Sequence, residues 1–171
     1  MSDRLVGSEM CIRDRLRGHD LYVYNPNSLT FNQGKIVARV RSVNLKRKIG
    51  DHVTFGDQEI KELSEFDVIW LRQDPPFDMG YITTTHLLDM VGQETLIVNN
   101  PFWVRNLPEK LLVLEFPELI PNTLITRDLE EIKEFKRDFG DIIIKPLYGN
   151  GGAGVFRLKE NDKNLVSLHE L

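Results

Sequence analysis

Residues 142–158 read IIIKPLYGNGGAGVFRL, and this stretch predicts a strand, a glycine-rich loop and a second strand. Isoleucine runs favour the extended backbone, and VFRL after the last glycine has β-branched and aromatic residues with an alternating face. Gly149, Gly151 and Gly154 satisfy G-x-G-x-x-G, but that pattern binds a dinucleotide only when a helix follows it. Because a strand follows Gly154, the sequence favours a β-hairpin over a dinucleotide-binding turn.

A glycine-rich hairpin is suited to holding the phosphates of ATP. Glycines let backbone N–H groups approach phosphate oxygens closely. Lys145 ends the first strand, and a phosphate would be the natural counter-charge for its ammonium. The alternative for Lys145 is an ordinary lysine whose head extends into solvent at a strand end. A Walker A loop is excluded, because no Lys-Ser or Lys-Thr pair follows the last glycine.

The composition predicts a cytoplasmic protein. The 171 residues are 41% hydrophobic and 28% charged, with a net charge of −4, which favours neither a nucleic acid nor a membrane surface as partner. Residues 39–48 are basic, and we interpret them as a solvated strand edge and turn. No window reaches the roughly 18 apolar residues of a membrane span, and no secretion signal is recognisable. The single cysteine, Cys11, excludes an intrachain disulfide and fits a reducing compartment.

Residues 1–15 have neither a helical nor a strand period. Within them, residues 10–15 (MCIRDR) resemble the translation of a sequencing-library adapter. We therefore expect residues 1–15 to be a non-native, adapter-like segment and the protein proper to begin near Leu16. The alternative is a genuine disordered amino terminus.

The next part of the chain predicts strands. Gly18 is placed to end a helix, and a short strand follows around Leu21 and Val23. Residues 31–43 alternate around an Asn-Gln-Gly turn, which predicts a hairpin, and residues 51–55 predict a further strand. The apolar face of the hairpin is expected to comprise Ile36, Ala38 and Val40.

Residues 66–98 predict a parallel α/β sheet. Residues 66–71 are a nearly continuous apolar run, residues 81–91 approach a helical spacing, and residues 95–98 are a second short apolar run. Ligands bind at the loops that follow the strands of such sheets. The loop RQDPPFD after the first run therefore makes Arg72, Asp74 and Asp78 candidate substrate-side residues. The alternative is a rigid proline turn that shapes a crevice without touching ligand.

Further elements are expected towards the carboxy terminus. Residues 106–116 predict a helix with Asn106 as a cap, and residues 123–126 predict a short strand. Residues 129–139 have apolar positions at helical spacing, preceded by Thr126 and Asp128 as candidate caps and ended by Gly140. A domain boundary is expected near residues 117–121.

The motifs at residues 142–158, 72–82 (RQDPPFDMGYI), 95–99 (TLIVN), 106–111 (NLPEKL) and 123–127 (TLITR) resemble those of prokaryotic glutathione synthetase, a member of the ATP-grasp superfamily. The resemblance runs from about Leu16 to the carboxy terminus. It implies an α/β fold, with a parallel-sheet pre-ATP-grasp domain over residues 16–118 and the first part of an ATP-grasp domain over residues 119–171.

The resemblance also implies an activity: ATP-dependent ligation of glycine to γ-glutamylcysteine through an acyl phosphate. Lys110 and Lys145 match lysines that contact ATP in that family, although composition alone would make Lys110 a solvated helix residue. The family's mobile loop corresponds to Gly149, Asn150, Gly151, Gly152 and Gly154. Magnesium ligands are expected beyond residue 171, no metal site or catalytic residue is identified within the chain, and a homo-oligomer is implied.

Relative to the family, an opening strand and helix and a long carboxy-terminal half are expected outside this sequence. The fragment itself is therefore expected to have no ligase turnover. Two alternatives remain: another ATP-grasp ligase, such as a D-alanine–D-alanine or ribosomal-protein glutamate ligase, and a non-catalytic ligand-binding α/β module.

Overall fold

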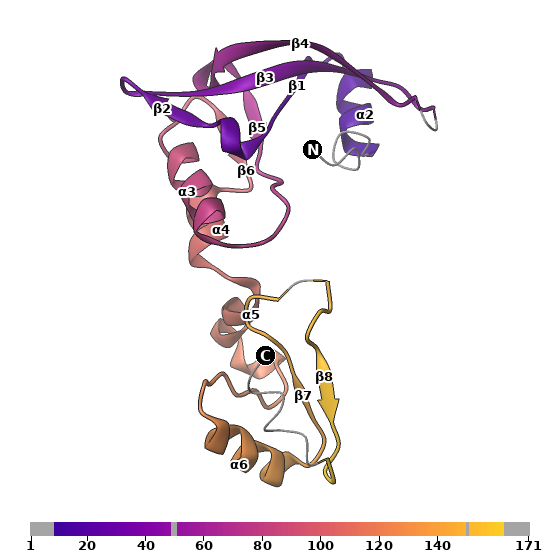
Figure 1. The fold of residues 1–171 in the computed structure, drawn as a ribbon, viewed down its shortest axis with the longest axis vertical. Helices are drawn as coiled ribbons and strands as arrows, with labels where there is room; N and C mark the ends of the chain where they lie inside the picture. Colours follow the sequence, from indigo (N-terminus) through magenta and orange to yellow (C-terminus); the bar gives the residue numbers. More distant parts are fainter. Residues whose placement is uncertain (1–8, 49–50, 150, 163–171) are drawn as a thin grey trace. The chain divides into compact units, whose positions relative to one another are not determined.

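The computed structural model describes residues 9–48, 51–149 and 151–162. The chain divides into two compact units, Met1–Asn106 and Leu107–Leu171 (Figure 1). The boundary predicted near residues 117–121 falls inside the second unit. The first unit therefore contains the RQDPPFD loop, and the second contains both the glycine loop and Lys110.

An antiparallel sheet dominates the first unit. Its central strand is β3 (Lys35–Leu45), which pairs with β1 (Leu21–Tyr24), β2 (Thr30–Asn32) and β4 (Val53–Glu62). The predicted hairpin is confirmed by the pairing of β2 with β3. Its turn residues Gln33 and Gly34 have φ values of 49° and 85°, a conformation that glycine adopts at no steric cost.

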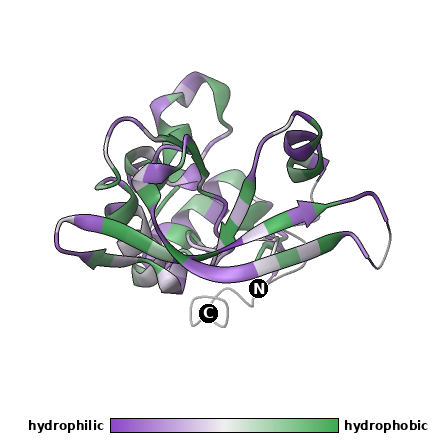
Figure 2. Cartoon of the chain, turned by 90° about the horizontal axis from the view of Figure 1, so that it is seen from above, coloured by the Kyte–Doolittle hydropathy of each residue, from purple (hydrophilic) through white to green (hydrophobic). Residues whose placement is uncertain are grey.

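The alternation along β3 positions the core. Ile36, Ala38 and Val40 are buried, as predicted, while the residues between them are half-buried or exposed. Figure 2 shows hydrophobic and hydrophilic bands alternating along the long strands. Strand β4 is longer than the predicted residues 51–55 and has no buried residue, because it lies at the edge of the sheet.

A parallel pair of strands completes the first unit. Strand β5 (Val68–Trp70) runs parallel to β6 (Leu96–Val98), and α3 (Met79–Leu88) lies between them in sequence. The strand–helix–strand prediction is thus confirmed. The parallel arrangement does not extend to β1–β4, where a two-residue turn joins β2 to β3; strands joined so tightly must run antiparallel.

The main core lies between the antiparallel sheet, the parallel pair and α3. The buried side chains of this cluster are Ile36, Ala38, Val40, Leu63, Ile69, Leu71, Leu88 and Val91. Helix α4 (Pro101–Asn106) packs against α3 (Figure 1). The described chain begins with α2 (Glu9–Leu16), whose Ile12 packs against Val43 and Leu45. The helix end predicted at Gly18 is confirmed, since α2 ends at Leu16 and Gly18 has a φ of 87°. The extent of α2 over residues 9–15 is not predicted, because residues 1–15 have no helical period.

The second unit is smaller. It comprises α5 (Glu109–Leu112), α6 (Leu129–Phe139) and the antiparallel strands β7 (Ile142–Ile144) and β8 (Phe156–Leu158). Short 3-10 helices occur in both units: η1 (Pro26–Ser28), η2 (Leu63–Glu65), η3 (Val113–Glu115) and η4 (Pro117–Leu119). Helix α6 confirms the helix predicted at residues 129–139, and β7 and β8 confirm the hairpin predicted at residues 142–158.

Two sequence predictions between residues 100 and 126 are wrong. The helix predicted at residues 106–116 is divided into α5 and η3, and Asn106 ends α4 instead of capping a later helix. The Asn100 side chain accepts a hydrogen bond from the Trp103 backbone N–H at 3.2 Å, so the helix starts earlier. Residues 123–126, all described, form no strand, and Thr123 instead bonds locally to the Pro121 carbonyl. None of the described helices is long and apolar enough to cross a membrane.

Candidate functional site

The glycine loop is carried by the β7–β8 hairpin. The register pairs Ile142 with Leu158 and Ile144 with Phe156, so these four side chains lie on one face. Ile142, Ile144 and Leu158 of that face pack with Leu129, Ile132 and Phe135 of α6, whereas Phe156 is exposed. Lys145 follows β7 directly and is exposed, at the base of the loop. A strand follows Gly154, which confirms the hairpin prediction and excludes the dinucleotide-binding turn.

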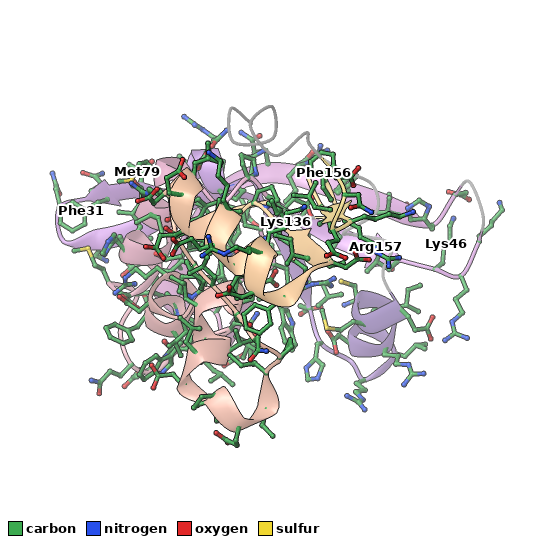
Figure 3. The ribbon with its side chains drawn as sticks, turned by 90° about the horizontal axis from the view of Figure 1, so that it is seen from below. Phe31, Lys46, Met79, Lys136, Phe156 and Arg157 are labelled. Atoms are coloured by element: carbon green, nitrogen blue, oxygen red, sulfur yellow. The ribbon has the colours of Figure 1, made fainter. Side chains whose placement is uncertain are left out.

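Polar contacts hold the open end of this hairpin, at the opposite end of the strands from the glycine loop. The Arg157 guanidinium donates to Asp141 Oδ2 at 2.7 Å, and the Glu160 backbone N–H donates to Asp141 Oδ1 at 2.9 Å. The bond from Arg157, followed by that from Glu160, lowers the pKa of Asp141 below its ordinary value. Lys136 of α6 donates to the Glu160 carbonyl; Figure 3 labels Lys136 and Arg157. Strand β8 is thus tied to both β7 and α6.

The loop backbone requires glycine at several positions. Gly151, Gly152 and Gly154 have φ values of 62°, 78° and 72°, which side chains of L-residues rarely permit. A Cβ on Gly154 would also lie 2.5 Å from Cγ of Pro146. Asn150, the remaining non-glycine candidate of the loop, lies outside the described residues. The described glycines leave backbone groups accessible, which is the property that phosphate binding needs.

Lys110 lies against the start of this loop. Its Nζ donates to the carbonyl oxygens of Pro146 and Gly149, each at 2.6 Å. The side chain belongs to the short helix α5 and is half-buried. Composition alone would leave Lys110 in solvent, whereas the structure brings it to the glycine loop. No sequence pattern predicts these carbonyl partners, because backbone carbonyls carry no residue signature.

The RQDPPFD loop lies in the other unit. Arg72, Gln73 and Asp74 line an open cavity of about 900 Å³ within that unit, beside β1 and β5. Asp78 has a structural role, because its Oδ1 accepts a hydrogen bond from the Tyr81 backbone N–H at 2.9 Å and so caps α3. Gln73, absent from the sequence-based candidates, has a buried Oε1 without a hydrogen-bond partner among the described residues. Substrate contacts for Arg72, Asp74 and Asp78 remain predictions.

The described residues offer no assignment for magnesium. Among residues 9–48, 51–149 and 151–162, no group of three or more His, Cys, Asp or Glu side chains is placed to hold a metal ion. We therefore assign none of these described residues to a metal.

The comparisons with known proteins agree with this geometry. Residues 109–171 match the family model described as prokaryotic glutathione synthetase, ATP-grasp domain, so the glycine hairpin is part of an ATP-grasp domain. Residues 8–105 match the model for the N-terminal domain of the same family. The chain therefore belongs to the prokaryotic glutathione synthetase family.

Curated relatives extend the match along nearly the whole chain. The glutathione synthetase of Brucella melitensis is 57% identical over 155 residues, covering 91% of this chain and 50% of the relative. That of Mesorhizobium japonicum is 54% identical with the same coverage. The chain thus spans about half the length of these relatives. A solved ATP-grasp ligase, PsnB complexed with minimal precursor, aligns with 93% of this chain and 56% of its own at 21% identity and a TM-score of 0.48, too weak a likeness for an argument.

Proposed function

We propose that this chain is the front part of a glutathione synthetase, which uses ATP to join glycine to γ-glutamylcysteine. The observation that carries the proposal is the match of both units, in order, to the two domains of one family. A different ATP-grasp ligase is not favoured, because the relatives at 57% and 54% identity, from Brucella melitensis and Mesorhizobium japonicum, are glutathione synthetases. A non-catalytic module is disfavoured by the same relatives.

In the proposed reaction the carboxylate of γ-glutamylcysteine attacks the γ-phosphate of ATP, which releases ADP and leaves an acyl phosphate. The amine of glycine then displaces phosphate from that acyl group and forms the new peptide bond. Such chemistry depends chiefly on positioning and charge neutralisation. In this chain, Lys145 supplies positive charge at the base of the loop, and the glycine backbone supplies N–H donors to phosphate oxygens.

The remaining assignments extend the proposal. Arg72 and Asp74 are proposed to face the substrate side, since they follow a strand at the carboxyl end of a parallel pair. We place the protein in the cytoplasm, with which the lack of any cysteine other than Cys11 of the adapter-like segment is compatible. Magnesium is expected to accompany ATP, and a homo-oligomer, implied by the family, is measurable by light scattering on the full-length protein.

The decisive experiment is Lys145→Ala in the full-length protein that contains this chain. Loss of one preorganised charge at the phosphates should lower kcat for glutathione formation by about 10²–10³-fold while the fold is retained. Lys133→Ala is the matched control: Lys133 pairs with Glu130 on the exposed surface of α6, and its substitution should leave the rate unchanged. Retention of full activity by Lys145→Ala would remove its phosphate role, and a wild-type protein that forms no glutathione would refute the proposed function itself.

A further inference from the structure

Lys110 makes contacts that a simple phosphate ligand would not need. Its ammonium reaches across from α5 and donates to two backbone carbonyls at the start of the glycine loop, Pro146 O and Gly149 O, both at 2.6 Å. These distances are short, as expected when the donor carries a charge. Lys110 as a whole is half-buried, and its bond to the Gly149 carbonyl is partly shielded from water.

Among the described residues, the glycine loop has few other restraints. A Cβ on Gly151 or Gly152 would meet no described atom within 4 Å, so these residues lie in open space. The backbone bonds described within the loop are long: Gly149 N to Pro146 O is 3.4 Å and Val155 N to Gly152 O is 3.3 Å. Glycines also have the widest backbone freedom to lose. A loop of this kind needs an external tether if its N–H groups are to be held in one arrangement.

We infer that Lys110 is a positioning residue, which fixes the backbone at Pro146 and Gly149 and thereby sets the base of the glycine loop before any nucleotide binds. An ammonium has three donors, and the two carbonyls use two of them. The third donor can reach a phosphate oxygen without release of the loop; this last step alone rests on the proposed function. The two lysines of the site thus differ: Lys145 contributes charge, and Lys110 contributes loop geometry.

The first test compares hydrogen exchange in the nucleotide-free 171-residue chain and its variants. Lys110→Met removes both carbonyl bonds, and amides in the loop should exchange about tenfold faster, since bonds to charged groups are among the stronger ones. Lys145→Met is the matched control, because Lys145 lies at the same loop but is exposed. In this variant the loop amides should exchange as slowly as in the unsubstituted chain. Lys110→Arg keeps the charge and the donors and should restore part of the protection. Equal loop exchange in the Lys110→Met and unsubstituted chains would overturn the inference.

A second test needs no substitution and covers the case in which Lys110→Met fails to fold. In the ¹³C,¹⁵N-labelled chain, the Lys110 ammonium should give a resolved NMR signal in slow exchange with water, with couplings through the hydrogen bonds to the carbonyl carbons of Pro146 and Gly149. A Lys110 signal that exchanges as fast as that of an exposed lysine would overturn the inference. Both tests are made without ATP, so their results do not depend on whether the full-length protein is a ligase. Failure of the inference about Lys110 can therefore be told apart from failure of the proposed function.

Discussion

The two units bury apolar surface to different extents. In the described part of Met1–Asn106, eight buried apolar side chains form one cluster and three more form a second. In the described part of Leu107–Leu171, the cluster contains two buried residues, Ile142 and Leu158. Since apolar burial is the main favourable term in folding, the first unit has the stronger core.

Polar contacts join the elements of the second unit around its small core. Lys110 binds the loop carbonyls, Lys136 binds the Glu160 carbonyl, and Asp141 binds Arg157 and the Glu160 backbone. Each such bond contributes modestly when exposed to water. The glycine loop therefore lies on the less strongly packed unit, which is compatible with the ligand-binding role proposed for it.

The largest expected effect comes from the core of the first unit. Leu63 has 0% exposure, and Leu63→Ala should lower the free energy of unfolding by about 2–5 kcal/mol through lost burial and a residual cavity. Both tryptophans, Trp70 and Trp103, lie in the first unit, so tryptophan fluorescence in urea follows that unit selectively.

Leu158→Ala provides the matched comparison in the second unit, where Leu158 is 4% exposed. It should leave the tryptophan transition in place and increase hydrogen exchange in β7 and β8. If Leu158→Ala shifts the fluorescence midpoint as much as Leu63→Ala does, the units unfold as one body and the contrast between them is lost.

The next effect concerns the loop backbone. Gly154→Ala should destabilise the hairpin by about 1–3 kcal/mol, because a left-handed φ strains an L-residue and the new Cβ would overlap Pro146. Gly152→Ala separates the two causes, since its φ is also positive but its Cβ would meet nothing within 4 Å. The rate of proteolytic cleavage at the loop should rank Gly154→Ala above Gly152→Ala, and both above the unsubstituted chain. Equal cleavage rates for the two variants would show that the contact between the new Cβ and Pro146 does not destabilise the hairpin.

Local patterns predicted much of the fold. The period of two in Ile36, Ala38 and Val40 predicted the face that is buried, because that period follows from strand geometry alone. Helix α6 was predictable from its caps, Asp128 and Gly140, which act within one turn of the chain. The resemblance at RQDPPFD and the glycine loop supplied the family.

Non-local pairing accounts for the parts of the fold that the sequence left undetermined. The antiparallel partners of β3 lie in different segments, so the extent of β4 could not be inferred from residues 51–55 alone. The TLIT run at residues 123–126 has strand propensity but no strand partner among the described residues. Asn100 followed by Pro101 was a readable cap signal, and recognising it would have predicted α4. The Lys110 contacts had no local signal at all.

A smaller effect tests the polar frame around the hairpin. Asp128 Oδ1 accepts from the Glu130 backbone N–H at 2.9 Å at the start of α6, and Asp128→Ala should cost about 1 kcal/mol of local stability. Asp138→Ala, at an exposed position in the last turn of the same helix, is the control and should cost less. Amide exchange in the first turn of α6 measures both. If the first-turn amides of α6 exchange as slowly in Asp128→Ala as in the unsubstituted chain, packing alone determines where the helix begins.

The smallest effect is a dependence on pH. Hydrogen bonding to Arg157 lowers the pKa of Asp141 below its ordinary value of 3.8. A lowered pKa stabilises the folded hairpin above pH 3.8, and this contribution is lost as the pH falls through the folded-state pKa. Asp141→Asn lacks the carboxylate, so its deficit in hairpin stability should be present at neutral pH and vanish in acid. Because the pair is exposed, the deficit should also shrink in high salt. Urea unfolding followed by the hairpin amides from pH 2 to 7 measures it, and a deficit of equal size at both ends of that range would mean that the Asp141 charge contributes nothing.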